Sequence, residues 1–223
     1  MYKHFLKRLI DIVLSTIGII VLTPVWIFLA IVIKIDDPGP VFFKQKRIAQ
    51  NKNGKKQYFT ILKYRSMKMC TPHDMPTHML ENPEQYITKV GRVLRKTSLD
   101  ELPQIFCIWV GKMSIIGPRP ALHNQDDLYA EREKYGANDV KPGLTGWAQI
   151  NGRDELEIDV KAKLDGDYTT VLNSGHFKGL VMDSRCFVGT IRSVLKHDGV
   201  VEGGTGEMKK ESEYSEHTEH IAK

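Results

Sequence analysis

Two adjacent carboxylates, Asp100 and Glu101, lie between fixed cations in the segment RKTSLDELPQIFCIWVGKMSIIGPRP (95–120). Arg95 precedes them, and Arg119 follows within Gly-Pro-Arg-Pro. Carboxylates beside cations can bind a metal ion and a polyphosphate while one carboxylate acts as a nucleophile. The prolines around Arg119 would restrict its backbone and favour two-pronged phosphate binding by its guanidinium, although the same sequence also suits a rigid connector. The segment is therefore the predicted centre of the chemistry.

Helix capping is an alternative role for the two carboxylates. Ser98-Leu99-Asp100-Glu101 matches the capping box, Pro103 suits the first turn of a helix, and Gly111 suits its end. The pattern alone favours capping. Capping does not exclude catalysis, because a helix N-terminus is also a favourable place for a phosphate. Both roles remain open at this point.

Other side chains could contribute to a phosphate or substrate site. Lys63 and Arg65 lie near the end of a predicted strand, where they would point at phosphate or form a solvated basic edge. The segment KPGLTGWAQINGR (141–153) combines glycines for tight turns with polar side chains. These candidate hydrogen-bond donors are Gln149, Asn151 and Arg153.

The region from Ile12 to Ile33 contains no charged side chain and is long enough to cross a bilayer, which takes about 20 apolar residues. Pro24 removes a backbone hydrogen bond near its middle, and Thr23 can satisfy a freed carbonyl. Basic residues flank both ends: Lys3, Lys7 and Arg8 before, then Lys34, Lys44, Lys46 and Arg47 after. The pattern leaves open a spanning helix and a re-entrant helix-break-helix with both ends on one side.

The remaining segments predict an α+β domain. The sequence Asp36-Asp37-Pro38-Gly39-Pro40 ends the apolar helix, and strands over 41–45 and 57–64 form a hairpin. Residues 70–87 predict a surface loop or lid, since His73, Asp74 and His78 lack metal-site spacing. Helical patterns follow at 86–96, at 121–135 with a charged, solvated face, at 156–168 and at 183–197. The last is basic and amphipathic, which suits a membrane interface or packing onto the core.

The charge of the chain is uneven. Its formal net charge is +5, of which residues 202–223 contribute −3 and the rest +8. A basic body suits lipid headgroups, nucleotides or nucleic acid. No nucleic acid is expected as a partner, because the N-terminus is apolar and no strand carries an aromatic-and-basic motif. Three cysteines without metal-type spacing indicate reduced packing residues, and the polar residues from Glu202 onward predict a disordered tail.

Seven segments together carry a resemblance to a known family. They are LKRLIDI (6–12), TP (23–24), DPGPVFFKQKR (37–47), ILKYRSM (61–67), RKTSLDELPQ (95–104), GPRP (117–120) and KPGLTGWAQINGR (141–153). In this order the chain, from Phe5 to about Val200, resembles the bacterial sugar transferase family of small monotopic phosphoglycosyl transferases. It departs from the family where Thr23 replaces a serine, where Lys112 replaces an acidic residue, and at Ile48-Ala49 after Arg47.

The resemblance implies a fold. This would be an α+β monotopic membrane protein with an N-terminal re-entrant helix-break-helix at Thr23-Pro24, amphipathic interfacial helices and a small β-hairpin. Residues 1–35 would be the membrane helix, 36–201 a catalytic domain and 202–223 the tail. The protein would lie on the cytoplasmic face of the bacterial inner membrane, in contact with its lipids, and a homo-oligomer stays open.

The resemblance also implies a reaction. A sugar-1-phosphate would pass from a UDP-sugar to polyprenol (undecaprenyl) phosphate, with release of UMP. Asp100 would be the nucleophile, ionised because of its low pKa, and would bind Mg²⁺ with Glu101. Arg95 and Arg119 would bind phosphate oxygens, with Lys63, Arg65 and Asp183 in support. The alternative is a non-catalytic membrane adaptor of a polysaccharide assembly complex.

Overall fold

The computed structural model describes residues 2–71, 82–152 and 156–196, and these residues form the expected α+β fold. The α-helices are α1 (Lys7–Val21), α2 (Thr23–Asp36), α3 (Lys89–Lys96), α4 (Gln104–Trp109), α5 (Asp126–Glu133), α6 (Trp147–Ile150), α7 (Ile158–Ser174) and α8 (His176–Lys196). The strands are β1 (Phe42–Lys52), β2 (Lys55–Tyr64), β3 (Ser114–Ile116) and β4 (Gly143–Thr145). The predicted tail, Arg153, and the centre of the predicted loop, with His73, Asp74 and His78, lie outside the described residues.

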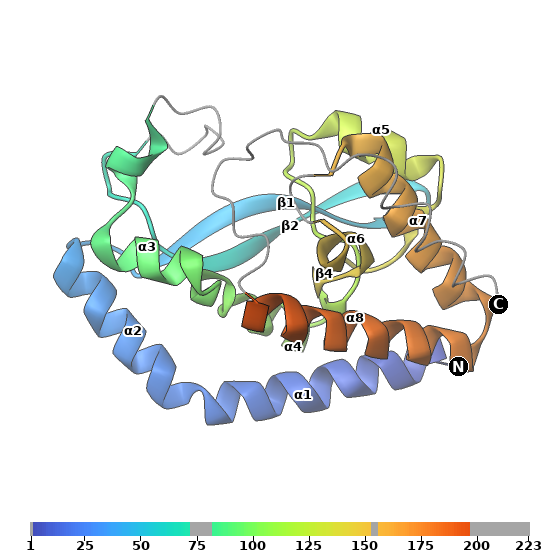
Figure 1. The fold of residues 1–223 in the computed structure, drawn as a ribbon, viewed down its shortest axis with the longest axis horizontal. Coiled ribbons are helices and arrows are strands. Elements are labelled where there is room, and N and C mark those ends of the chain that lie inside the picture. The colour runs from blue at the N-terminus through green and yellow to red at the C-terminus, as the bar shows by residue number, and fades with distance from the viewer. Residues whose placement is uncertain (1, 72–81, 153–155, 197–223) are drawn as a thin grey trace.

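Helices α1 and α2 form a bent pair that runs along one side of the molecule (Figure 1). They meet at Leu22 with a bend of 60°. Pro24 lies in the first turn of α2, and the Thr23 hydroxyl donates to the Ile19 carbonyl at 2.8 Å. No single helix among the described residues is long and apolar enough to cross a membrane, whereas this bent pair meets that criterion when both halves are counted.

The burial pattern of α1 is the reverse of that in a water-soluble protein. Its buried residues are Lys7, Asp11 and Ser15, spaced by four and therefore on one face. The exposed side chains of the pair are large and apolar, among them Leu9, Val13, Leu14, Ile17, Ile20 and Val21 of α1 and Ile27, Phe28, Ile31 and Ile35 of α2. A continuous exposed apolar surface of this kind indicates contact with an apolar phase or partner.

Polar contacts fix α1 to the rest of the fold. Asp183 of α8 accepts hydrogen bonds from Lys7 Nζ at 2.6 Å, from the Tyr2 hydroxyl at 2.5 Å and from the Tyr168 hydroxyl at 2.8 Å. All four side chains are buried. Burial, together with the nearby Asp183 carboxylate, raises the pKa of both tyrosines, so each hydroxyl stays a donor. Asp11 accepts from the Ser114 hydroxyl and the Ile115 amide at the start of β3.

Arg8 connects the bent pair to α4. Its guanidinium donates to the carbonyls of Ile108 and Trp109 at 2.6 and 2.7 Å. These carbonyls belong to the C-terminal turn of α4, where a cation satisfies unpaired acceptors and complements the helix dipole. Lys7 and Arg8, which precede the apolar region, therefore make structural contacts in addition to forming a charged flank.

The predicted hairpin is present, and β1 extends well beyond residue 45. Its antiparallel register runs from Phe42↔Tyr64 to Ala49↔Gln57, and Asn53 and Gly54 both have positive φ, as a tight hairpin turn requires. The prediction ended β1 too early because the following residues are polar and charged. One face of the hairpin is solvated, so such residues fit there. Phe59 and Ile61 pack on α4 from the other face.

The C-terminal half differs from prediction in helix bounds. Helix α8 starts at His176 and α7 continues to Ser174, whereas α5 is shorter than the predicted 121–135. The predicted solvated face of α5 is wrong at Arg132, which is buried. Helices α7 and α8 pack with Tyr2, Ile116 and Val140 into one apolar cluster. Strand β3 pairs in parallel with β4, which brings residues 114–116 beside 143–145.

Asp183→Asn tests the contact between α8 and the N-terminus. The substitution leaves the Lys7 ammonium buried without a charged partner, so we expect the free energy of unfolding to fall by about 3 kcal/mol. Glu131→Gln is the control, because it breaks an exposed pair with Lys134 and should lower the free energy of unfolding far less. Denaturant titration of the purified protein measures both, and equal effects would contradict a stabilising role for Asp183.

Candidate active site

Asp100 and Glu101 lie in a short 3₁₀ turn, Leu99–Glu101, between α3 and α4. The capping-box alternative is wrong. Ser98 has a left-handed φ of 56°, and its side chain makes no capping hydrogen bond. Pro103 precedes α4 as its N-cap, and Gly111 follows the helix with a φ of 85°. The two carboxylates are therefore free of a capping role.

Glu101 binds two cations that come from distant parts of the chain. Lys63 Nζ of β2 lies 2.8 Å from Glu101 Oε1. Arg119 lies 2.9 Å from the same oxygen through Nη2 and 3.3 Å from Oε2 through Nη1. Burial opposes ionisation of Glu101, but the Arg119 guanidinium and the Lys63 ammonium outweigh it and lower its pKa. Glu101 is thus an ionised carboxylate that orients both cations.

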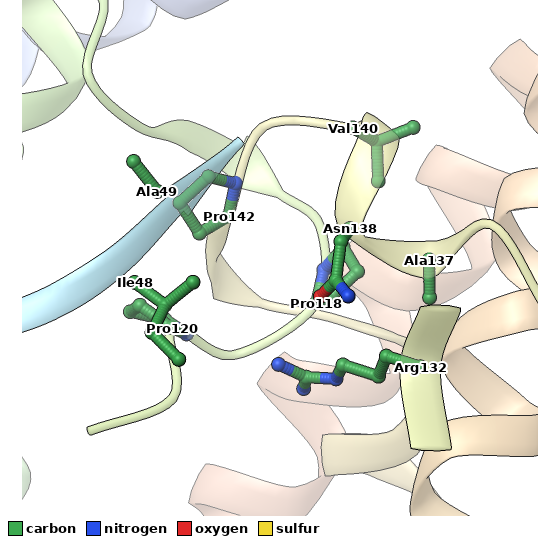
Figure 2. A pocket seen from close by; sticks show the side chains of 9 residues that line it. All are labelled: Ile48, Ala49, Pro118, Pro120, Arg132, Ala137, Asn138, Val140 and Pro142. Atoms are coloured by element: carbon green, nitrogen blue, oxygen red, sulfur yellow. The ribbon is translucent and has the colours of Figure 1, made fainter. Parts of the chain in front are cut away.

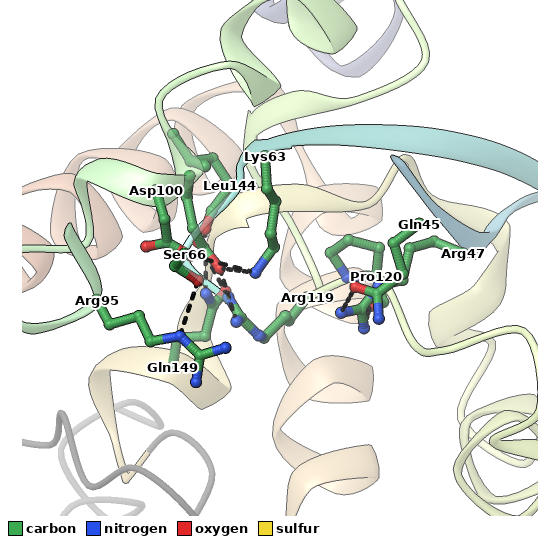
Figure 3. Close-up of polar contacts among 11 residues, drawn as sticks. Gln45, Arg47, Lys63, Ser66, Arg95, Asp100, Arg119, Pro120, Leu144 and Gln149 are labelled. Atoms are coloured by element: carbon green, nitrogen blue, oxygen red, sulfur yellow. Dashed lines mark hydrogen bonds and ion pairs between the residues drawn. The ribbon is translucent and has the colours of Figure 1, made fainter. Parts of the chain in front are cut away.

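Asp100 is buried beside this group, yet it accepts no hydrogen bond from the described residues. Its Oδ2 lies 3.8 Å from Lys63 Nζ, and its exposure is 9%. The sequence predicted a low pKa for Asp100; in the substrate-free protein burial shifts this pKa upward from the ordinary value of an aspartate, and Glu101 adds to the effect. Lys63, Arg95 and Arg119 oppose that rise. Figure 3 shows these cations gathered near Asp100.

The loop that carries Arg119 is fixed by backbone contacts with the segment around β4. The Gly117 amide donates to the Thr145 carbonyl at 2.8 Å, and the Gly143 amide donates to the Pro118 carbonyl at 2.9 Å. A Cβ atom at Gly143 would lie 2.2 Å from the Gly117 nitrogen, so only glycine permits this approach. Arg119 therefore projects from a rigid base.

The structure separates the two basic residues predicted near the end of β2. Lys63 reaches Glu101, whereas Arg65 donates to the Pro40 carbonyl at 2.7 Å and pairs with Asp37. Arg65 thus stabilises the turn between α2 and β1. Arg95, at the end of α3, donates to the Ser66 hydroxyl at 2.9 Å (Figure 3).

The other predicted site residues make contacts in different parts of the fold. Gln149 of α6 donates to the Leu144 carbonyl at 3.1 Å, and its buried Oε1 has no partner among the described residues. Asn151 donates to the Trp147 carbonyl at 2.7 Å. Asp183 contacts Tyr2, Lys7 and Tyr168 instead of the carboxylate pair.

Two arginines near the Arg119 loop were not predicted. Arg47 donates to the Pro120 carbonyl at 2.9 Å, and Arg132 donates to the Arg119 carbonyl at 3.0 Å. Neither has a spacing that distinguishes it from the surrounding charged residues. Only the position of Arg47 inside DPGPVFFKQKR offered a signal.

A small cavity of about 20 Å³ lies beside the same loop (Figure 2). Its lining residues are Ile48, Ala49, Pro118, Pro120, Arg132, Ala137, Asn138, Val140 and Pro142. The volume suffices for about one water molecule. The cavity is therefore too small to enclose a nucleotide.

The carboxylate pair offers the kind of oxygen ligand that a magnesium ion prefers. The described residues contain no cluster of three or more His, Cys, Asp or Glu side chains. Mg²⁺ is commonly bound by one or two carboxylates, with phosphate oxygens and water as the remaining ligands. Asp100 supplies such oxygen donors and accepts no competing hydrogen bond from the described part of the chain, whereas both oxygens of Glu101 already bind Lys63 or Arg119.

A family model and individual relatives all match this chain as a sugar transferase. A model described as "Bacterial sugar transferase" matches residues 2–197. The UDP-glucose:undecaprenyl-phosphate glucose-1-phosphate transferase of Escherichia coli (strain K12) is 40% identical over 178 residues, or 74% of this chain and 36% of that protein. The uncharacterized sugar transferase EpsL of Bacillus subtilis (strain 168) is 37% identical over 195 residues, or 87% of this chain and 90% of EpsL.

The name of a third relative contains a different sugar. The UDP-N-acetylgalactosamine-undecaprenyl-phosphate N-acetylgalactosaminephosphotransferase of Aeromonas hydrophila is 33% identical over 195 residues, or 86% of this chain and 44% of that protein. The chain thus spans less than half of this relative and of the E. coli one, but most of EpsL. Because the family model covers nearly the whole chain, this protein belongs to the bacterial sugar transferase family.

Proposed function

We propose that this chain transfers a sugar-1-phosphate from a UDP-sugar to undecaprenyl phosphate and releases UMP. The observation that supports it is the buried, sparsely bonded carboxylate of Asp100 beside two cations held by Glu101. The names of the E. coli and A. hydrophila relatives support a UDP-sugar donor and an undecaprenyl-phosphate acceptor. They name different sugars, so family membership does not fix the sugar.

In the first step, an Asp100 carboxylate oxygen attacks the phosphorus that bears the sugar. A bond forms between that oxygen and phosphorus, the bond to the bridging oxygen of the diphosphate breaks, and UMP leaves with the electron pair. The product is an aspartyl phospho-sugar. An acyl phosphate of this kind remains reactive enough to pass the group onward. No general base is needed once Asp100 is ionised.

The cations around Asp100 favour both ionisation and phosphate binding. Lys63 and Arg119 are already oriented by Glu101, and Arg119 remains 35% exposed in its side chain, so it can contact a phosphate oxygen. Arg95 adds positive charge beside Asp100. Oriented cations stabilise negative charge that develops on the phosphoryl oxygens during transfer. Asp100 and Glu101 would hold Mg²⁺, which when bound neutralises charge on the diphosphate and on departing UMP.

In the second step, a phosphate oxygen of undecaprenyl phosphate attacks the phosphorus of the adduct. The Asp100–phosphorus bond breaks, the carboxylate is regenerated, and a diphosphate joins lipid to sugar. This acceptor requires a site at a membrane. The exposed apolar surface of α1 and α2 supports such a position, and α8 adds exposed Phe177, Phe187 and Ile191.

The bent pair would enter and leave the bilayer on the same side. The polar face of α1 packs on the protein, and the bent pair turns at Leu22. Basic residues flank both ends of the apolar region. Basic flanks favour the cytoplasmic side. We therefore place the chain on the cytoplasmic face of the bacterial inner membrane as a monotopic protein.

Isotope exchange tests the covalent step. Purified protein, Mg²⁺, labelled UMP and a UDP-sugar that supports UMP release, without lipid, should exchange label because the first step is reversible. We expect Asp100→Asn to reduce exchange by at least about a thousandfold, and EDTA to suppress it. Asp159→Asn, at an exposed position, is the matched control. Full exchange by the Asp100 variant would exclude this residue as nucleophile.

The pH dependence tests the electrostatics of Asp100. Activity should fall as pH decreases through the Asp100 pKa, because only the ionised carboxylate attacks. Burial raises this pKa and Lys63 opposes the rise, so Lys63→Met should raise it further and move the acid limb of UMP release to higher pH. Lys52→Met at the exposed hairpin end should leave the limb in place. A limb that stays or moves to lower pH in Lys63→Met would contradict this role.

Cysteine labelling tests the membrane topology. Cys70 is exposed and is replaced by serine, whereas Cys107 and Cys186 are buried and should not react. Cysteines introduced at Lys3 and Lys52 should then react with a membrane-impermeant maleimide from the same, cytoplasmic side. Labelling of the two positions from opposite sides would show a spanning helix instead.

A further inference from the structure

Arg132 and Asp165 form a buried ion pair outside the carboxylate site. Arg132 Nε and Nη2 of α5 lie 2.9 and 2.6 Å from Asp165 Oδ2 of α7. Their side chains are 5% and 1% exposed. A buried pair of charges is costly to desolvate and is weak evidence for stability by itself. The pair is therefore better explained by the contacts it makes with its surroundings than by stability.

The same guanidinium contacts the loop that carries the phosphate-binding arginine. Arg132 Nη2 donates to the Arg119 carbonyl at 3.0 Å. The Arg119 side chain in turn binds Glu101, next to Asp100. A continuous series of contacts thus leads from Asp165 through Arg132 and the Arg119 backbone to the carboxylate pair.

Backbone hydrogen bonds fix the loop at Gly117 and Pro118, whereas the Arg132 hydrogen bond holds it at Arg119 itself. Pro118 and Pro120 stiffen the loop internally, but they do not determine where it lies relative to Asp100. A small cavity lies between these prolines and Arg132 (Figure 2). Arg47 holds the next carbonyl, that of Pro120, from β1. Two arginines from separate elements therefore bind successive carbonyls of the loop.

We propose that the Arg132–Asp165 pair positions the Arg119 guanidinium for diphosphate binding by holding the Arg119 carbonyl. Asp165 orients the planar fork of Arg132, and the fork presents an N–H group to the carbonyl. Arg132 is thus a positioning residue that acts through Arg119 and does not itself contact substrate. This inference rests on the proposed function, since it assumes that Arg119 binds the diphosphate of a UDP-sugar.

The variant Arg132→Lys distinguishes positioning of the Arg119 loop from neutralisation of the Asp165 charge. A lysine keeps a positive charge next to Asp165, but its single ammonium lacks the fork that bonds Asp165 and the carbonyl together. Asp165→Glu is the second variant, because it keeps the opposite charges while displacing the guanidinium. Removing Asp165 altogether risks unfolding the chain, so that change is avoided.

Binding of UDP, in the presence of Mg²⁺, is the readout, measured by calorimetry on the full-length protein. We expect Arg132→Lys and Asp165→Glu each to weaken UDP binding about tenfold. Arg119→Gln should weaken it at least as much, and Arg132→Lys should cause no further loss in the Arg119→Gln background. Glu131→Gln, at an exposed pair on the same helix, should bind UDP as the parent does.

The outcomes distinguish this inference from the function on which it rests. Folded Arg132→Lys and Asp165→Glu proteins with parental UDP affinity would overturn the positioning role, with the thermal midpoint reporting the fold. Additive losses in the double variant would also overturn it, because they would show action independent of Arg119. A parent protein that neither binds UDP nor releases UMP from any UDP-sugar would instead contradict the proposed function.

Discussion

The carboxylate of Glu101, held by Lys63 and Arg119, is the interaction on which the site depends. Two adjacent carboxylates in a buried turn repel each other and lose solvation, and either effect favours protonation. The cations that offset these effects come from β2 and from the loop after β3, with Arg95 added from α3. The site therefore exists only when the hairpin, α3 and the Arg119 loop are assembled around the 3₁₀ turn.

The N-terminal helices connect this site to their surroundings. Helix α1 buries Lys7, Asp11 and Ser15 and exposes its apolar side chains, so its polar face is the one that packs on protein. Asp11 contacts the start of β3, which leads into the Arg119 loop, and Arg8 contacts the end of α4, which follows the carboxylates. A membrane-bound position for α1 would thus be coupled to the active segment through polar contacts on both sides.

Strained or close backbone geometry also occurs where these elements meet. Ser98, immediately before the carboxylates, has a positive φ that side chains other than glycine adopt at a cost. Gly117 and Gly143 let two backbone segments approach more closely than any side chain would allow. Such features persist because the surrounding contacts determine them, which is typical of segments that must place side chains accurately.

The sequence by itself determined the α+β class and the hairpin, since local pattern and turn chemistry specify these. The break at Thr23-Pro24 and the roles of Asp100, Glu101 and Arg119 followed from the family resemblance, because the local pattern left them open. Tertiary structure decided which polar residues serve the site. It assigned Lys63 to Glu101 and Arg65 to Asp37, and it buried Arg132 on a helix whose pattern predicted a solvated face. A charged residue has the same local pattern whether it faces water or a carbonyl, so only the packing of distant elements distinguishes the two.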